Sequence, residues 1–454
     1  MPYISLNPTN NQIVQNHASW DSHRLEQALE KAHSAQQIWA QSPFWVRTKM
    51  LRDVAVELLA QRYWYATSIT MEMGKPLLEA RAEVEKCAAM CDYYAHHGED
   101  FLRAQSAESD AGKSYVAYYP LGVVLAIMPW NFPFWQVFRA AVPALMAGNA
   151  VVLKHASNVP QCALALQAIF REGGLPEGLF TALMIEVAQV SGVIASPHVH
   201  GVTLTGSEDA GRKVAAEAGK NLKKCVLELG GSDPFIVLQD ADLELAVTLA
   251  VASRFLNCGQ SCIAAKRFIV VPEVADDFLR RFKIKVAELK LGDPLEAATQ
   301  IGPMARSDLR KTLHAQVTDS IARGAVAITG CQPVEGEGFF YQPSILDHVT
   351  PNTRAYHEEL FGPVAIVIRA ANEGDALRIA NDTRFGLGSS IWSKDTARAE
   401  RLAEQIQAGC TFINGMVKSD PHLPFGGIKD SGYGRELSKQ GIHEFVNAKT
   451  VWIR

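Results

Sequence analysis

Two cysteines, Cys258 and Cys262, stand four residues apart in the stretch FLNCGQSCIAAKR, whose residue types can support chemistry. The pair could form a disulfide, supply half of a metal site, or contain one nucleophile. A catalytic cysteine has to be presented as a thiolate near a base and an oxyanion donor. The residues after Cys262 are compatible with a helix, whose first N–H groups would stabilise negative charge. This pattern favours Cys262 as the nucleophile, with a buried structural thiol as the alternative for any one cysteine.

A structural zinc site would need four ligands, usually in two close pairs. Cys87 and Cys91 form the only other close pair of cysteines, and they fall in EARAEVEKCAAMCDYYA, which predicts a helix with both thiols on its core face. The sequence has no histidine pair at ligand spacing. We therefore expect no metal, and we expect the eight scattered cysteines to be mostly buried thiols.

Length and charge limit the classes of function. A chain of 454 residues is long enough for two or three domains. The formal net charge of −4 is spread without long runs of one sign, which argues against a nucleic acid or a membrane surface as partner. The N-terminus lacks a signal-peptide pattern, and the most apolar stretch, LGVVLAIM, is too short to span a bilayer. We expect a cytoplasmic protein.

The order of the expected elements indicates an α/β protein. The first hundred residues are mainly helical, beginning after a cap at Asp21 or Ser22. The polar segment 101–120 is compatible with an exposed hairpin or arm. From residue 121, short apolar runs alternate with helical stretches, which is typical of a parallel sheet covered on both faces. A second alternating region runs from DPFIVLQDAD to about residue 430. The two α/β units meet near residues 228–262.

Five motifs in the chain resemble those of the aldehyde dehydrogenase superfamily, and they occur in that family's order over nearly the whole length. They are PWNFP at 129–133, ELGGSDP at 228–234, FLNCGQSCIA at 255–264, EELFGPV at 358–364 and PFGGIKDSGYGRE at 424–436.

The resemblance implies a catalytic role for four residues. Cys262 would attack the aldehyde carbon and form a thiohemiacetal. Asn131 would donate its side-chain amide to the oxyanion, together with the Cys262 N–H. Glu228 would act as the general base that activates the cysteine or the hydrolytic water. Glu436 is a candidate for proton relay. A side-chain cap for Asn131 and a solvated or ion-paired carboxylate for each glutamate are the alternatives.

The family binds its dinucleotide on a Rossmann-like sheet without the usual GxGxxG. By similarity, the segment Thr205–Gly211 would open a helix against the pyrophosphate through Gly206 and Ser207, and an ordinary N-cap at Ser207 is compatible with that role. Trp130 would lie near the cofactor. Glu359 and Phe361 would hold the nicotinamide ribose and ring.

Lys154 and Ser157 govern the choice of cofactor. In the family pattern, Lys154 would contact the adenosine ribose, and Ser157 stands where NAD-preferring members often carry Glu. A carboxylate there would repel a 2′-phosphate, whereas a serine beside a lysine could bind it. His155 is a further departure, because it replaces a proline. We expect NADP, with NAD possible.

Arg139 suggests that the substrate is an aldehyde with a carboxylate, such as succinate semialdehyde. It lies eight residues after Asn131, about two helical turns along one face. Arginine suits bidentate carboxylate recognition, and the chain is similar to the succinate-semialdehyde dehydrogenase branch at this offset. Ser419 or Lys418 would supply a second contact. The alternative for Arg139 is a surface position, and Ala140 departs from the lysine that many members carry.

The resemblance also implies a homodimer or homotetramer and a division of the chain. The competing functions are a general aldehyde dehydrogenase, a CoA-acylating member, a non-catalytic structural member and a cofactor-free cysteine hydrolase. We further raise the hypothesis that oxidation joins Cys258 to Cys262 and blocks turnover.

The expected division of the chain into domains is residues 1–101 and 121–228 as the cofactor-binding domain, 229–430 as the catalytic domain, and 102–120 with 431–454 as the oligomerisation arm and C-terminal segment.

Overall fold

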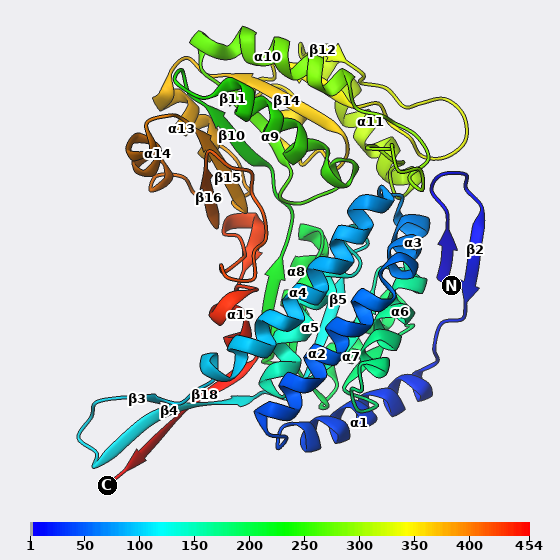
Figure 1. Ribbon diagram of the computed structural model, residues 1–454, viewed down its shortest axis with the longest axis vertical. Coiled ribbons are helices and arrows are strands. Elements are labelled where there is room, and N and C mark those ends of the chain that lie inside the picture. Colours follow the sequence, from blue (N-terminus) through cyan, green and yellow to red (C-terminus); the bar gives the residue numbers. More distant parts are fainter. Residues whose placement is uncertain (1–2) are drawn as a thin grey trace.

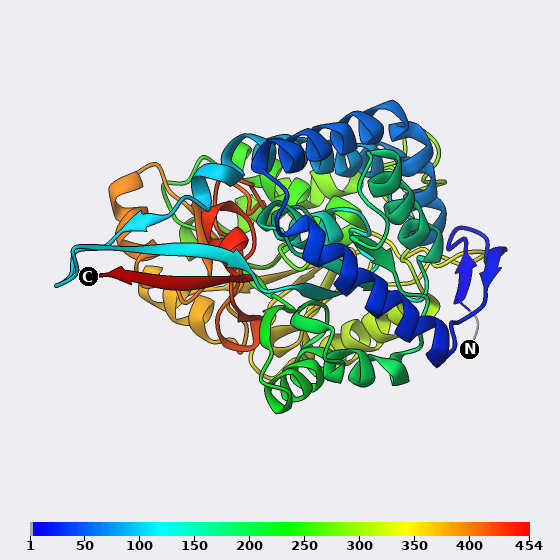
Figure 2. The ribbon, with the colours of Figure 1, turned by 90° about the horizontal axis from the view of Figure 1, so that it is seen from below.

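The computed structural model describes residues 3–454, so residues 1 and 2 of the expected first domain lie outside the described residues. Two large sheets, each with its own helices and its own apolar core, occupy the upper and lower parts of Figure 1. A slender arm that carries the C-terminus projects from the lower part, and Figure 2 shows it from below.

The lower sheet has six strands in the order β17-β9-β8-β5-β6-β7, and only β17 is antiparallel to its neighbour. Its central strands are continuous apolar runs, as expected for strands buried on both faces. The chain starts at β5, moves outward through β6 and β7, and returns to β8 on the other side. The bounds are β5 Val123–Met128, β6 Ala150–His155, β7 Phe180–Ala182, β8 Val199–Thr205, β9 Lys224–Glu228 and β17 Gly432–Tyr433.

This reversal of direction places a crevice at the carboxyl ends of β5 and β8, where open α/β sheets bind ligands. Right-handed crossovers put α5 and α6 on one face of the sheet and α7 and α8 on the other. Helices α2, α3 and α4 form an outer layer against α5 and α6. Asp21 caps α1, as the sequence predicts. The bounds are α1 Ser22–Trp39, α2 Phe44–Ala60, α3 Arg62–Met73, α4 Leu77–Phe101, α5 Trp135–Ala147, α6 Pro160–Glu172, α7 Val190–Ala195 and α8 Glu208–Lys220.

The upper sheet has seven strands in the order β12-β13-β14-β11-β10-β15-β16, with β12 as its one antiparallel member. The strands are β10 Asp233–Val237, β11 Ala265–Val270, β12 Val326–Thr329, β13 Ser344–Asp347, β14 Val364–Arg369, β15 Gly388–Trp392 and β16 Cys410–Ile413. The helices are α9 Leu243–Phe255, α10 Pro272–Ala287, α11 Ser307–Ala322, α12 Arg354–His357, α13 Glu373–Asn381 and α14 Thr396–Ala403.

The arm joins two distant segments of the chain. Strand β4 (Lys113–Pro120) pairs along its whole length with β18 (Val446–Ile453), and β3 (Gln105–Ser106) adds a short third strand. Helix α15 (Ser438–His443) leads into β18, and a separate hairpin of β1 (Tyr3–Leu6) and β2 (Ile13–His17) lies at the opposite end of the molecule. Within residues 3–454, no helix combines the length and the apolar character needed to cross a membrane.

Candidate active site

The loop that carries Cys262 lies between a 3-10 turn, η2 (Leu256–Gly259), and strand β11. The helix expected after Cys262 is wrong, because residues 265–270 form a buried strand that pairs with β10 and β14. The N–H groups of residues 265–270 therefore belong to a strand and not to the start of a helix. The chain instead reverses through three consecutive residues with positive φ, Asn257 (56°), Cys258 (56°) and Gly259 (72°).

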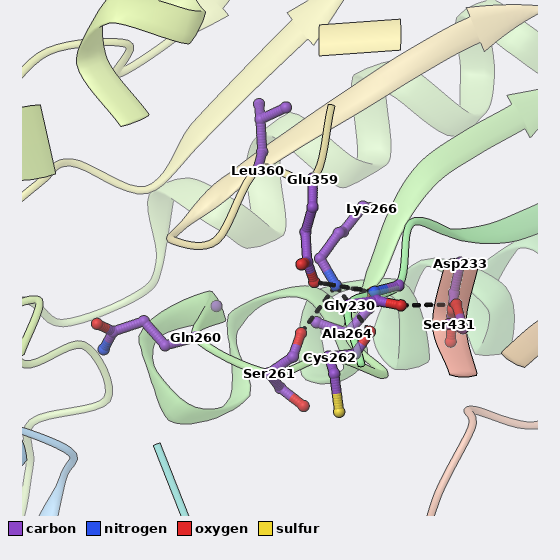
Figure 3. A network of polar contacts seen from close by, with 12 residues as sticks. Gly230, Asp233, Gln260, Ser261, Cys262, Ala264, Lys266, Glu359, Leu360 and Ser431 are labelled. Atoms are coloured by element: carbon purple, nitrogen blue, oxygen red, sulfur yellow. Dashed lines mark hydrogen bonds and ion pairs between the residues drawn. The ribbon is translucent and has the colours of Figure 1, made fainter. Parts of the chain in front are cut away.

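Lys266 holds the backbone of this loop in place, as Figure 3 shows. Its Nζ donates to the carbonyl oxygens of Ser261 and Cys262, each at 2.8 Å, and lies 3.1 Å from Glu359 Oε1. The Cys262 side chain points away from this network in the same view. The lysine therefore fixes the loop through carbonyl groups and leaves the sulfur free for another partner.

Cys262 stands where two cavities meet. One has a volume of about 180 Å³ and is lined by α4, α5 and the loop 416–419, and the other has about 250 Å³ and lies at the carboxyl ends of β5, β8 and β9. Burial raises the pKa of the Cys262 thiol to about 12, although Arg139 and Lys266 lower it. The thiol is therefore protonated at neutral pH, and ionising it requires a base or a bound partner.

Glu228, the last residue of β9, is 2% exposed. Neither of its carboxyl oxygens has a hydrogen-bond partner within residues 3–454. Burial, and then repulsion by Glu436, raise its pKa well above the ordinary value, although Arg139 and Arg435 lower it. Burial of this kind favours the neutral form of a carboxyl group and makes it a stronger proton acceptor once it ionises.

Arg139 and Glu436 form a buried ion pair, with Arg139 Nε 2.6 Å from Glu436 Oε2 and side-chain exposures of 2% and 4%. The alternative of a surface arginine is therefore wrong. Arg139 lines the smaller cavity together with Cys262, and its guanidinium lies 4.6 Å from the centre of the Phe425 ring. Burial raises the pKa of Glu436, although Arg139 lowers it.

Asn131 lies in the second cavity with Cys262 and is 4% exposed. Its side-chain Nδ2 donates to the backbone carbonyl of Gln260 at 3.1 Å, and its backbone carbonyl accepts from Asn257 Nδ2 at 2.8 Å. One hydrogen of the Asn131 amide is thus engaged, and the second is available for an oxyanion.

The second cavity also brings together most of the expected cofactor residues. Ser207 caps α8 by accepting from the Ala210 N–H, as the sequence predicts. The Trp130 and Phe361 rings meet edge to face with centroids 5.8 Å apart. Trp130, Gly206, Ser207, Glu359 and Phe361 all line this cavity.

Lys154 and Ser157 line a third cavity, of about 420 Å³, beyond the end of β6. Ser157 is exposed, whereas Lys154 is 6% exposed and donates to the His155 carbonyl at 2.6 Å. Burial lowers the pKa of Lys154 to about 8. His155, which replaces the family's proline, is buried with Nε2 2.9 Å from the Pro133 carbonyl, so it links β6 to the PWNFP loop.

Ser419 lies in the smaller cavity, as the sequence predicts, but its neighbours there were not anticipated. Its Oγ accepts from Trp135 Nε1 and from Lys86 Nζ, each at 2.9 Å. Glu79 on the same helix as Lys86 also lines the cavity and accepts from the Asn257 N–H at 2.7 Å. The spacing of Glu79, Glu83 and Lys86 places them on one face of a helix, but the same spacing is found on ordinary solvent-exposed faces. The sequence therefore contains no signal that these residues line a cavity.

Cys258 does not face the three cavities described above. Its side chain is fully buried, and its sulfur accepts from the Gly302 N–H at 3.1 Å. Both Cys258 and Cys262 are free thiols. The oxidation hypothesis for this pair stays a prediction.

The chain belongs to the aldehyde dehydrogenase family, whose sequence pattern matches residues 2–451, and it is an NAD(P)-dependent oxidoreductase of that family. It is 49% identical, over the full length of both chains, to a Synechocystis sp. protein named probable succinate-semialdehyde dehydrogenase (NADP(+)). It is 46% identical to an Escherichia coli protein named succinate semialdehyde dehydrogenase (NAD(P)+) Sad, covering 99% of this chain and 97% of the relative. The crystal structure of succinic semialdehyde dehydrogenase from Streptococcus pyogenes in complex with NADP+ superposes with a TM-score of 0.98, at 38% identity and 99% coverage of each chain.

Proposed function

We propose that this aldehyde dehydrogenase oxidises succinate semialdehyde to succinate with NADP as its preferred cofactor. The observation that carries the proposal is a single cavity in which Cys262 is joined by Arg139 and Ser419, two groups suited to a carboxylate. The similar proteins from Synechocystis, Escherichia coli and Streptococcus pyogenes are each named succinate or succinic semialdehyde dehydrogenase, which supports the proposal.

The residues of the second and third cavities fit a dinucleotide. The N-terminus of α8 at Ser207 suits the pyrophosphate. Thr205 Oγ1 is buried in the same cleft and has no hydrogen-bond partner within the described chain, as expected of a group that meets a ligand. Lys154 and Ser157 would bind the 2′-phosphate. Glu186 also lines this cavity, so NAD, which carries no 2′-phosphate, is acceptable as well. A nicotinamide held by these residues would supply the acceptor for the hydride of the substrate carbon.

In the proposed mechanism, the ionised form of Glu228 first takes the proton of the Cys262 thiol and passes it on through Glu436. The thiolate attacks the aldehyde carbon, a C–S bond forms, and the carbonyl electron pair moves to oxygen. The free amide hydrogen of Asn131 and the Cys262 N–H stabilise this oxyanion. Oxidation leaves a thioester on Cys262. Glu228 then takes a proton from water, the hydroxide attacks the thioester, and the C–S bond breaks to release succinate. Glu436 passes the proton onward.

The arm supports assembly into a homodimer or homotetramer. Tyr119, Trp452 and Ile453 on its paired strands are 48–49% exposed, which leaves large apolar side chains available for a second copy.

The test is the initial rate with succinate semialdehyde and with butanal, an uncharged aldehyde of the same carbon number, each with NADP and with NAD. We expect kcat/KM to favour the charged aldehyde by at least about 100-fold, as expected when a buried site is built for a charged group. Equal rates for both aldehydes would identify a general aldehyde dehydrogenase. A requirement for CoA would identify an acylating enzyme, and well-folded protein that oxidises neither aldehyde would contradict the proposal.

A further inference from the structure

Two cations border the smaller cavity, Arg139 from α5 and Lys86 from α4. They differ in how their charge is balanced. Arg139 is already neutralised by Glu436, and this pair is shielded from solvent on both sides. A substrate carboxylate bound to Arg139 alone would place two carboxylates on one guanidinium, which is unfavourable in a buried setting.

Lys86 has no such partner. Among residues 3–454, no carboxylate oxygen lies within 4.0 Å of its Nζ. Burial and then the charge of Arg139 lower the pKa of Lys86 to about 8, so it stays a cation at neutral pH. Glu83 and Asp420 act on it only at longer range, and each is engaged elsewhere, Glu83 with Lys75 and Asp420 with His422. The ammonium group lies 4.1 Å from the centre of the Trp135 ring, which orients it without neutralising it.

Ser419 connects Lys86 to the cavity. Its oxygen accepts two hydrogen bonds, from Lys86 Nζ and from Trp135 Nε1. A hydroxyl oxygen has two lone pairs and one hydrogen, so both lone pairs are occupied and the hydrogen remains to be donated. The lysine and the tryptophan therefore orient Ser419 as a donor toward a group in the cavity.

We propose that Lys86 is the specificity-determining cation of this enzyme, binding the substrate carboxylate jointly with the Ser419 hydroxyl. This inference rests on the proposed function, because it names the group that recognises the charged end of that substrate. Arg139 then adds no net charge but helps to orient the substrate carboxylate. It does so through its Nη2, which has no hydrogen-bond partner in the described part of the chain. One ammonium balances one carboxylate, and the Arg139–Glu436 pair stays intact.

Three variants test the inference. Lys86→Met removes the charge and keeps the length of the side chain, and Lys86→Arg restores a cation. Arg81→Met is the matched control, because Arg81 is on the same helix but pairs with Glu85 (3.4 Å) outside the cavity. For each, kcat/KM is measured with succinate semialdehyde and with butanal, and the Kd of succinate is measured by calorimetry.

We expect Lys86→Met to lower kcat/KM for succinate semialdehyde by about 10- to 100-fold, mainly through KM, and to weaken succinate binding by a similar factor. The rate with butanal should change by less than about threefold, and Lys86→Arg should recover most of the loss. An equal loss for both aldehydes, or unchanged succinate binding, would overturn the inference. If wild-type protein shows no preference for the charged aldehyde, the proposed function itself fails, whereas a wild-type preference that Lys86→Met retains removes only the role of Lys86.

Discussion

Arg139 Nε lies 2.6 Å from Glu436 Oε2, so a residue expected to bind substrate is ion-paired with a residue expected to relay protons. Both side chains are buried, and they come from segments almost three hundred residues apart. The pair therefore couples the charge of the proposed substrate-binding residue to that of the proposed proton relay.

Breaking this pair should destabilise the fold. Arg139→Met leaves Glu436 buried without its partner, and we expect a loss of about 3–5 kcal/mol in the free energy of unfolding. The double variant with Glu436→Gln should lose less than the sum of the two single variants, as urea unfolding in a double-mutant cycle would show. Arg323→Met, which removes a partly exposed pair with Asp319 (2.8 Å), is the control and should cost about 1 kcal/mol or less. Strict additivity at Arg139 and Glu436 would contradict the coupling.

The pH dependence of the reaction should follow the raised pKa of Glu228. Its base form is populated only above that pKa, so kcat should rise with pH through it. The protonated carboxyl favours the folded state, so its contribution to stability is complete below the unfolded pKa of Glu and is lost as pH rises through the folded pKa. We expect Glu228→Gln to lower kcat by about 10²- to 10⁴-fold and to flatten this loss of stability. An unchanged kcat–pH profile in the variant would exclude Glu228 as the base.

Ser157 should control the choice between NADP and NAD. We expect Ser157→Glu to lower kcat/KM for NADP by about 100-fold, because a carboxylate at position 157, next to the proposed site of the 2′-phosphate, repels that group, while the value for NAD is kept or raised. Ser157→Ala, which removes one hydroxyl without adding charge, should cost NADP only about tenfold. Steady-state kinetics with both cofactors measures this, and an unchanged cofactor ratio in Ser157→Glu would place the 2′-phosphate elsewhere.

Oxidation tests the relation between Cys258 and Cys262. If peroxide joins them, activity lost to peroxide should return on treatment with a thiol, and in Cys258→Ala the loss should no longer be reversible. Cys410→Ala is a matched control, since Cys410 is also a free thiol but lies on β16. Equal sensitivity and equal recovery in wild type and Cys258→Ala would end the hypothesis.

Local sequence determined the elements and the order of the motifs. Runs such as VVLAIM form buried strands because continuous apolar residues suit a sheet covered on both faces. The cap at Ser207 could be predicted because it needs only a hydroxyl group next to the free N–H groups of the helix that follows it in the chain. The motifs also singled out Cys262, Asn131 and the residues expected to bind the cofactor, which the structure brings together in the second cavity. The helix expected after Cys262 failed because tertiary pairing with β10 and β14 overrides a weak helical preference.

Only the tertiary structure decided which charges face one another. Lys86 and Glu79 are ordinary charged residues on a helix, and they become cavity residues because α4 packs against α5. Glu436 neutralises Arg139, whereas no carboxylate of residues 3–454 lies within ion-pair distance of Lys86. Both facts depend on distances between segments far apart in the chain. Electrostatic energy depends on separation and burial, which periodicity and spacing do not contain. The sequence by itself therefore predicted the nucleophile at Cys262, and the fold decided which cation of the smaller cavity, Lys86, has no carboxylate within ion-pair distance in residues 3–454.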